Sequence, residues 1–206
     1  MHNKTFPDPR IEFFDSIAEK WDAWHDLQSL AGKFEALFEE FNISPGETVL
    51  DVGCGTGNLT TALLHRLGPT GRIVAVDIST HMLVQSRRKV DDTRVTWHEA
   101  SADRLPLEDG AMDRVICFSV WPHFEDCETA ATELRRVLRS GGYLHIVHFI
   151  SRDQVNHIHQ EAHPSVHRDQ LFPASETAAI LRKSGYCVTA MTDNEQRYIV
   201  SARRQG

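Results

Sequence analysis

The chain has 206 residues, of which 41% are hydrophobic and 25% charged, a composition typical of a soluble globular protein with material for one sizeable core. Acidic residues outnumber basic ones by 29 to 22 and the formal net charge is −7, which disfavours a nucleic-acid substrate because phosphate binding normally needs a basic patch. No apolar stretch approaches the roughly 18 residues that a membrane-spanning helix needs.

The N-terminus and the cysteines indicate a cytoplasmic protein. Residues 1–10 are polar and lack the apolar core of a secretory signal peptide. The four cysteines form no CxxC pair and no closely spaced framework, and free thiols are typical of a reducing compartment; they are Cys54, Cys117, Cys127 and Cys187.

The first part of the chain is dense in aromatic residues at helical spacing. Between residues 11 and 41, apolar side chains recur at steps of three and four, which predicts two helices with Gly32 as a weak point. The residues that carry the pattern are Phe13, Phe14, Ile17, Trp21, Trp24, Phe34, Leu37, Phe38 and Phe41.

From residue 48 onward, short apolar runs alternate with helical segments. Strands are expected at 48–52, 72–77, 95–97, 113–118 and 143–150, and helices at 60–67, at 79–90 and from the fourth strand to residue 138. Ser140, Gly141 and Gly142 are expected to end the last of these helices. Such alternation predicts an α/β fold with a parallel sheet and right-handed crossovers.

The end of the chain breaks this alternation. A helix is expected at 174–184, followed by two strands at 186–191 and 197–202 that the polar residues 192–195 join as a hairpin. The hairpin would add an antiparallel strand to the sheet. We therefore expect a Rossmann-like, seven-stranded, mostly parallel sheet with helices on both faces and a helical N-terminal cover.

Residues 51–57, with the sequence DVGCGTG, follow a predicted strand and open a predicted helix. Three glycines let the backbone turn sharply and approach a ligand closely, although a tight turn without a ligand is the simpler alternative. A dinucleotide-binding loop requires G-x-G-x-x-G, and Asn58 stands where its third glycine belongs. An NAD-dependent oxidoreductase is therefore disfavoured.

At this motif the sequence resembles the class I S-adenosylmethionine (SAM)-dependent methyltransferases, in particular the small-molecule type related to the menaquinone- and ubiquinone-pathway C-methyltransferases. The resemblance covers roughly residues 11–150 and includes several motifs in order. It implies methyl transfer from SAM to a small-molecule acceptor. It also implies a helical lid within residues 1–45 and one compact SAM-binding domain at 46–206.

The resemblance assigns cofactor contacts residue by residue. The backbone at Gly53 and Gly55 would hold the methionine portion of SAM. Asp77, at the end of the second strand, would accept the ribose hydroxyls, as the spacing from the glycines also suggests. Ile78 and Asp103 would contact adenine, and Trp21 stands at a lid position where relatives often carry tyrosine. The full expected set is Trp21, Asp51, Gly53, Cys54, Gly55, Gly57, Asp77, Ile78, Met82, Ala102, Asp103, Phe118 and Ser119.

Six of the 12 histidines fall between residues 145 and 167. Three interpretations are open for this stretch: a solvated polar loop, a general base near neutral pH, or a transition-metal site. His148 or His123 would be the base. Residues 157–163 are expected to be helical before Pro164, which would place His159 and His163 at i, i+4 on one face, and His148, His159 and His163 would be the metal ligands. A non-catalytic SAM- or metal-binding protein that uses residues 145–167 is the alternative to an enzyme. Neither a nucleic acid nor a membrane is expected as a partner.

Overall fold

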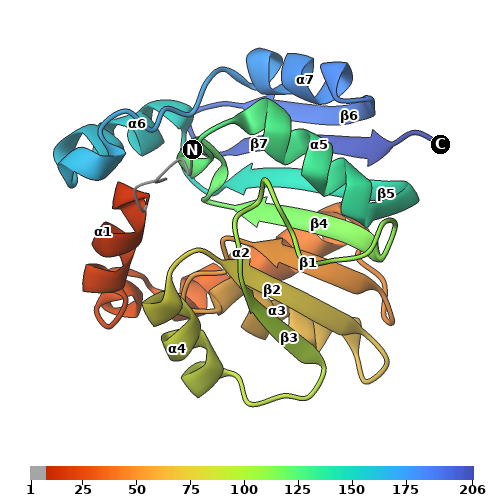
Figure 1. Ribbon diagram of the computed structural model, residues 1–206, viewed down its shortest axis with the longest axis horizontal. Helices are drawn as coiled ribbons and strands as arrows, with labels where there is room; N and C mark the ends of the chain where they lie inside the picture. The colour runs from red at the N-terminus through yellow and green to blue at the C-terminus, as the bar shows by residue number, and fades with distance from the viewer. Residues whose placement is uncertain (1–7) are drawn as a thin grey trace, which may run out of the picture.

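The computed structural model describes residues 8–206 and contains a single seven-stranded sheet (Figure 1). Its strand order is β3-β2-β1-β4-β5-β7-β6. Strands β1 to β5 pair in parallel, whereas β7 runs antiparallel to both β5 and β6. The strands are β1 (Thr48–Val52), β2 (Arg72–Asp77), β3 (Val95–Glu99), β4 (Met112–Phe118), β5 (Leu138–His148), β6 (Tyr186–Asp193) and β7 (Tyr198–Arg204). The predicted fold class is confirmed.

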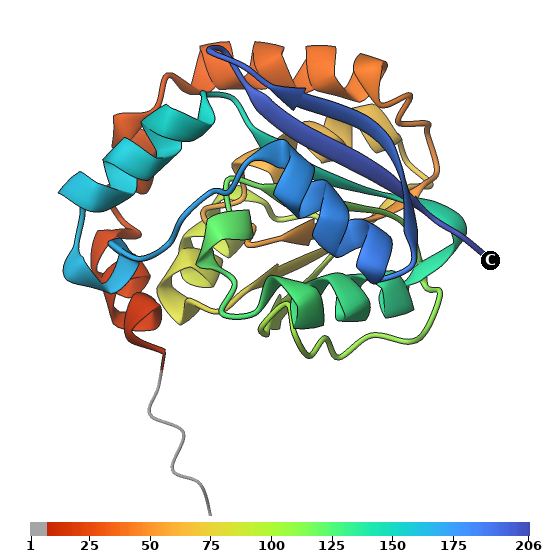
Figure 2. The same cartoon turned by 90° about the horizontal axis from the view of Figure 1, so that it is seen from above.

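Helices cover both faces of the sheet (Figure 2). The side chains of β1 alternate between two cores, since Val49 packs with α2 and α3 on one face and Leu50 packs with α5 and α7 on the other. Every helix of residues 8–206 is too short or too polar to cross a lipid bilayer. The α-helices are α1 (Pro9–Ile17), α2 (Leu27–Glu40), α3 (Asn58–Leu67), α4 (Thr80–Lys89), α5 (Cys127–Val137), α6 (Arg152–Glu161) and α7 (Ala174–Lys183), and the short 3-10 helices are η1 (Trp21–Trp24), η2 (Trp121–His123) and η3 (Pro164–Val166).

The order in which the chain adds strands to the sheet reverses between β1 and β4. From β1 the chain proceeds through β2 to β3 at one edge and then returns to β4 on the other side of β1. Open parallel sheets bind ligands outside the carboxyl ends of the strands at such a reversal. Helices α1 and α6 lie beyond the carboxyl ends of the parallel strands (Figure 1).

The N-terminal segment differs from its sequence-based prediction. Gly32 lies inside the uninterrupted α2, and the break between the helices falls at 18–26 instead. Capping explains the boundary, because the Asp26 carboxylate accepts the backbone N–H of Ser29 and so begins a new helix there. Residues 1–7 of the expected cover, and most of the segment expected to lack a signal peptide, lie outside the described residues.

Two further boundaries differ in the second half of the chain. The turn expected at 140–142 belongs to β5, because α5 ends at Val137 and the strand pairing shifts register between Met112 and Arg114. The helix expected around 157–163 begins earlier, as α6. Ser151 starts it through a capping box with Gln154, in which each side chain bonds the other's backbone N–H.

Candidate active site

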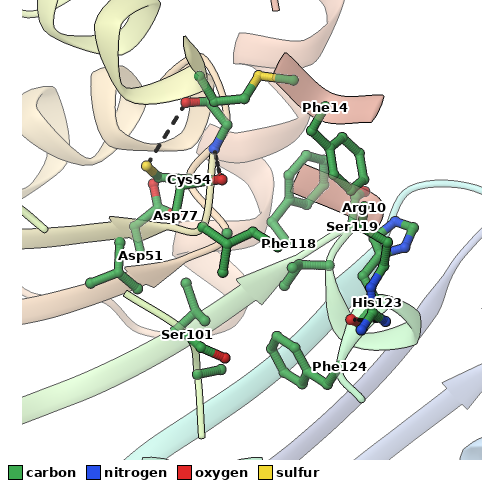
Figure 3. A pocket seen from close by; sticks show the side chains of 18 of the residues that line it. Arg10, Phe14, Asp51, Cys54, Asp77, Ser101, Phe118, Ser119, His123 and Phe124 are labelled. Carbon is green, nitrogen blue, oxygen red and sulfur yellow. Dashed lines mark hydrogen bonds between the residues drawn. The ribbon is translucent and has the colours of Figure 1, made fainter. Parts of the chain in front are cut away.

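A cavity of about 440 Å³ opens at the carboxyl ends of β1, β2 and β4, at the reversal point of the sheet (Figure 3). This size falls within the range of small-molecule sites. Residues of the N-terminal cover, including Phe14 and Trp21, close its far side. Of the expected cofactor residues, those that line it are Trp21, Asp51, Gly53, Cys54, Gly55, Asp77, Ile78, Met82, Ala102, Asp103, Phe118 and Ser119.

The glycines between β1 and α3 serve different purposes. Gly53 has φ +65°, and a Cβ there would lie 2.3 Å from Cγ2 of Val120. Gly55 also has positive φ, +52°, but a Cβ would meet nothing within 4 Å, so it leaves open space at the cavity. A Cβ on Gly57 would lie 3.0 Å from Ser86, which explains this glycine by packing against α4 rather than by the cavity.

Asp77 ends β2 and organises the loops beside it. Its Oδ2 accepts the N–H of Gly55 at 2.8 Å, and its Oδ1 accepts the N–H of Ser79 at 2.8 Å. Burial raises the pKa of the Asp77 carboxyl, and the hydrogen bonds from these backbone groups oppose that rise. Each carboxylate oxygen has a further lone pair, so Asp77 can still accept hydrogen bonds from a ligand in the cavity.

Asp51 is a second buried carboxyl at the cavity, on β1. Its Oδ2 accepts the hydroxyl of Thr60 at 2.6 Å. Burial raises the pKa of Asp51 to about 7, the Thr60 hydrogen bond opposes the rise, and the negative charge of Asp77 adds to it. The ionisation state of Asp51 therefore changes near neutral pH.

This raised pKa gives Asp51 a pH-dependent effect on stability with a defined sign. An unfolded Asp51 ionises near 3.8, whereas the folded protein holds the proton up to about 7. The stabilisation is complete below the unfolded value and is lost as pH rises towards the folded one. Asp51→Asn stays neutral, so we expect its stability relative to wild type to rise between about pH 5 and pH 7 by up to about 1.4 kcal/mol per pH unit, and then to level off.

Denaturant unfolding of the ligand-free protein at a series of pH values measures this difference. Asp103→Asn is a suitable control because Asp103 is exposed at the same cavity, and its difference from wild type should not follow that profile. A stability difference for Asp51→Asn that stays constant over the whole range would contradict a protonated Asp51 in the fold.

Two carboxylates that the sequence analysis did not single out fasten the N-terminal cover over the glycine loop. Asp22 accepts the hydroxyl of Thr56 at 2.6 Å and pairs with Lys89 at 2.6 Å. Asp15 accepts the hydroxyl of Ser79, two residues after Asp77 in the chain, at 2.5 Å. Local sequence gives no signal for either role, because each partner lies more than thirty residues away, the separation being 34 residues for Thr56 and 64 for Ser79.

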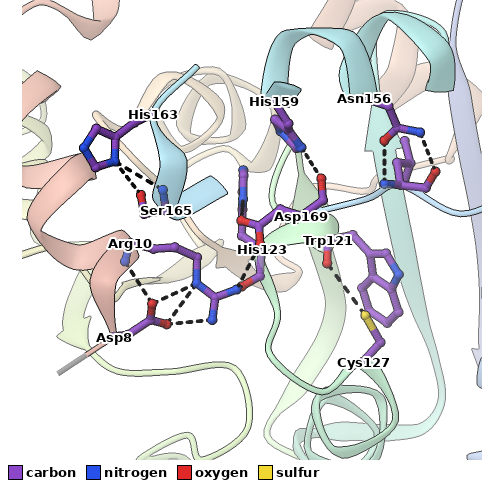
Figure 4. A network of polar contacts seen from close by, with 11 residues as sticks. Asp8, Arg10, Trp121, His123, Cys127, Asn156, His159, His163, Ser165 and Asp169 are labelled. Atoms are coloured by element: carbon purple, nitrogen blue, oxygen red, sulfur yellow. Dashed lines mark hydrogen bonds and ion pairs between the residues drawn. The ribbon is translucent and has the colours of Figure 1, made fainter. Parts of the chain in front are cut away.

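The two expected catalytic histidines have different surroundings. His123 lines the cavity, and its Nδ1 lies 2.7 Å from Oδ2 of Asp169 (Figure 4). His148 ends β5, is 2% exposed and does not line the cavity. Burial lowers the pKa of His148 to about 3, and the nearby His123 and His159 add to the effect. His148 is therefore neutral and enclosed, which argues against it as the base.

The expected metal site at His148, His159 and His163 is not formed. Within residues 8–206, no three His, Cys, Asp or Glu side chains are grouped so that they could hold a metal ion. His163 stacks on Phe13 with ring centroids 5.2 Å apart, and the Nδ1 of His159 bonds the backbone oxygen of Asp169. The i, i+4 spacing was misleading because α6 ends at Glu161, before His163.

Comparison with known proteins shows which family this sequence resembles. The methyltransferase domain family matches residues 50–146. Over 145 residues the chain is 34% identical to the ubiquinone/menaquinone biosynthesis C-methyltransferase of Hahella chejuensis, covering 66% of this chain and 57% of that protein. It is 35% identical over 139 residues to the demethylmenaquinone methyltransferase of Symbiobacterium thermophilum, covering 64% and 55%. The matched part spans little more than half the length of these curated relatives.

The solved structures agree in fold. A SAM-dependent methyltransferase from Aquifex aeolicus superposes with a TM-score of 0.76 at 23% identity, covering 92% of this chain and 97% of that one. A SAM-dependent methyltransferase from Methanococcus maripaludis gives 0.72 at 20% identity, covering 100% and 97%. The chain contains a methyltransferase domain at residues 50–146, and its sheet has the fold of SAM-dependent methyltransferases.

The cavity suits SAM on two structural observations. Asp77 offers buried carboxylate oxygens at the end of β2, where two ribose hydroxyls can bond them. A Cβ on Gly55 would meet nothing within 4 Å, so the glycine leaves space in which a ligand can approach the backbone closely.

The part of the cavity wall outside residues 50–146 is contributed by the N-terminal cover. Asp169, which supports His123, also lies outside the matched residues. The methyltransferase family match therefore covers the cofactor side of the site and leaves much of the remaining side to this chain's own sequence.

Proposed function

We propose that this protein transfers the methyl group of SAM to a small-molecule acceptor. The observation that carries the proposal is that one cavity contains the glycine loop, the buried carboxylate of Asp77 and the imidazole of His123. A cofactor held by the first two would lie in the same enclosed space as a group able to act on an acceptor. The cover contributed by α1 and η1 supports a small acceptor rather than a macromolecular one.

The chemistry asked of the protein is modest. When bound, SAM supplies a methyl group on a sulfonium, which is already a good leaving group. The chain must then position the two reactants and exclude water, and proximity alone can contribute several orders of magnitude in rate. Phe14, Trp21 and Phe118 give the cavity an apolar wall that serves both purposes.

Isothermal calorimetry with S-adenosylhomocysteine (SAH), the demethylated product, tests the cofactor part of the proposal. We expect binding with a Kd of roughly 1 µM, which corresponds to about 8 kcal/mol. NAD should not compete, because Asn58 occupies the position of the third dinucleotide-binding glycine. Undetectable SAH binding would reject the proposal, and tight NAD binding would favour an oxidoreductase instead.

Transfer itself is tested with SAM that carries a labelled methyl group. We expect label to enter the small-molecule fraction of a cell extract and SAH to form in equal amount. A protein that only binds SAM would give the same calorimetric result but no SAH beyond the background of the extract. Label found only in protein or nucleic acid would contradict the small-molecule acceptor.

A further inference from the structure

His123 is held at the cavity wall by contacts on several sides. It ends η2, the short helix that follows β4, and its side chain is 13% exposed. Phe14 of α1 packs edge-on against the imidazole, and His159 of α6 lies beside it with ring centroids 4.7 Å apart. Within residues 8–206 the ring is hydrogen-bonded through Nδ1, to Asp169, and has no such protein partner at Nε2.

Asp169 connects this imidazole to the N-terminal cover. It lies between η3 and α7, and its side chain is 10% exposed. Its Oδ2 meets His123, and its Oδ1 lies 3.5 Å from the guanidinium of Arg10 (Figure 4). The same guanidinium donates to the backbone oxygen of His123 and pairs with Asp8. The carboxyl group of Asp169 is thereby placed between one guanidinium and one imidazole.

The other ionisable groups near His123 leave Asp169 as its direct charged partner. Asp8 is paired with Arg10 on α1. Burial lowers the pKa values of His159 and His148, so both imidazoles are neutral at neutral pH. Glu125 is exposed after η2, and its negative charge interacts with the guanidinium of Arg10.

We propose that Asp169 is a positioning residue that holds His123 with its proton on Nδ1, and that Nε2 of His123 is thereby the general base for an acceptor that must lose a proton. The inference rests on the proposed methyl transfer and narrows its acceptor to a protic nucleophile. A carboxylate can only accept a hydrogen bond, so it selects the Nδ1–H tautomer and leaves the lone pair on Nε2.

The step balances in atoms and charge. Nε2 takes the proton of the acceptor X–H group, and the electron pair of that bond stays on X. That pair forms the new bond from X to the methyl carbon, while the electrons of the carbon–sulfur bond remain on sulfur and give neutral SAH. His123 becomes an imidazolium, whose positive charge Asp169 stabilises across their hydrogen bond. The proton then passes to water.

The tautomer can be measured without knowing the acceptor. Long-range proton–nitrogen correlation spectra of the neutral imidazoles, assigned with His123→Gln, distinguish a protonated Nδ1 from a protonated Nε2. We expect His123 of the wild-type protein to show the Nδ1–H pattern, and Asp169→Asn to lose it in favour of exchange between both tautomers. A wild-type His123 protonated on Nε2 would overturn the proposal, whether or not any variant folds.

Chemical modification gives a second readout. Diethylpyrocarbonate reacts with an unprotonated imidazole nitrogen, and mass spectrometry follows each histidine separately. We expect slower modification of His123 in Asp169→Asn than in wild type, with SAH affinity unchanged. His157→Gln is the matched control, since His157 is exposed on the same helix as His159, and it should leave the reactivity of His123 as in wild type. Equal reactivity of His123 in Asp169→Asn and wild type would count against Asp169.

Once an acceptor is in hand, the same variants separate chemistry from binding. General-base catalysis typically contributes about 10²-fold or more, so His123→Gln should lower kcat by at least that factor without weakening SAH binding. Absence of SAH binding by the wild-type protein would reject the proposed function, whereas a wild-type His123 protonated on Nε2 would reject only the roles given to Asp169 and His123.

Discussion

Replacing Gly53 by alanine should destabilise the fold severely. A left-handed φ of +65° costs a non-glycine residue roughly 1–2 kcal/mol. The added Cβ would also lie 2.3 Å from Cγ2 and 2.7 Å from Cβ of Val120, and overpacking of this kind costs about 1–3 kcal/mol more. Together these terms remove about 2–5 kcal/mol from a total stability of about 5–15 kcal/mol. Thermal unfolding should show Tm lowered by roughly 10 °C.

Gly55→Ala is the matched control for this effect. Its φ of +52° brings a comparable backbone cost, but its Cβ would meet nothing within 4 Å. We expect a loss of only about 1–2 kcal/mol in stability, and weaker SAH binding because the new methyl group occupies the cavity edge. The double variant Gly53→Ala with Val120→Ala should recover part of the stability that Gly53→Ala loses. Equal Tm values for the two single glycine variants would show that the contact with Val120 is unimportant.

Asp77→Asn should produce the largest loss of cofactor affinity. Both oxygens of Asp77 already accept backbone N–H groups, from Gly55 and Ser79. An amide has only one oxygen, so its NH₂ group would face one of these donors, and it would offer fewer acceptors to the ribose. Losing one or two charge-assisted hydrogen bonds, each worth about 1.5–3 kcal/mol, predicts SAH binding weaker by about 2–4 kcal/mol.

Calorimetry with SAH measures this change, which corresponds to a Kd raised roughly 30- to 1000-fold. Asp103→Asn provides the comparison, because Asp103 is exposed at the same cavity and its loss should raise Kd by less than about tenfold. An unchanged Kd for a folded Asp77→Asn protein would remove Asp77 from the cofactor site. Circular dichroism of the variant establishes that the fold is intact before the titration is interpreted.

The cofactor side of the site could be predicted because its information is local. Residues 51–57 are contiguous, and Asp77 ends the next strand of a parallel sheet. Strand order alone therefore brings them together at the carboxyl ends of two neighbouring strands. The C-terminal hairpin was equally readable, since 186–193 and 198–204 flank a short polar turn. Among the expected cofactor residues, Gly57 alone is absent from the cavity lining, and only packing shows that a Cβ there would face Ser86.

The histidines show where sequence reasoning fails. His148 and His123 are the same residue type, yet His148 is enclosed at the end of β5, whereas His123 lines the cavity from η2. Burial decides whether an imidazole can titrate near neutral pH, and burial depends on what other segments pack against it. The same limit applies to the metal prediction, which relied on helical spacing that α6 does not extend to His163.

The sequence by itself therefore determined the sheet, the glycine loop and the carboxylate of Asp77, because short-range patterns and strand order specify them. Only the tertiary structure decided how His123 is held. Arg10, His123 and Asp169 lie 113 and 46 residues apart in sequence, and folding alone brings them into contact. No sequence periodicity predicts these contacts, because each of the three residues is separately compatible with an ordinary surface position.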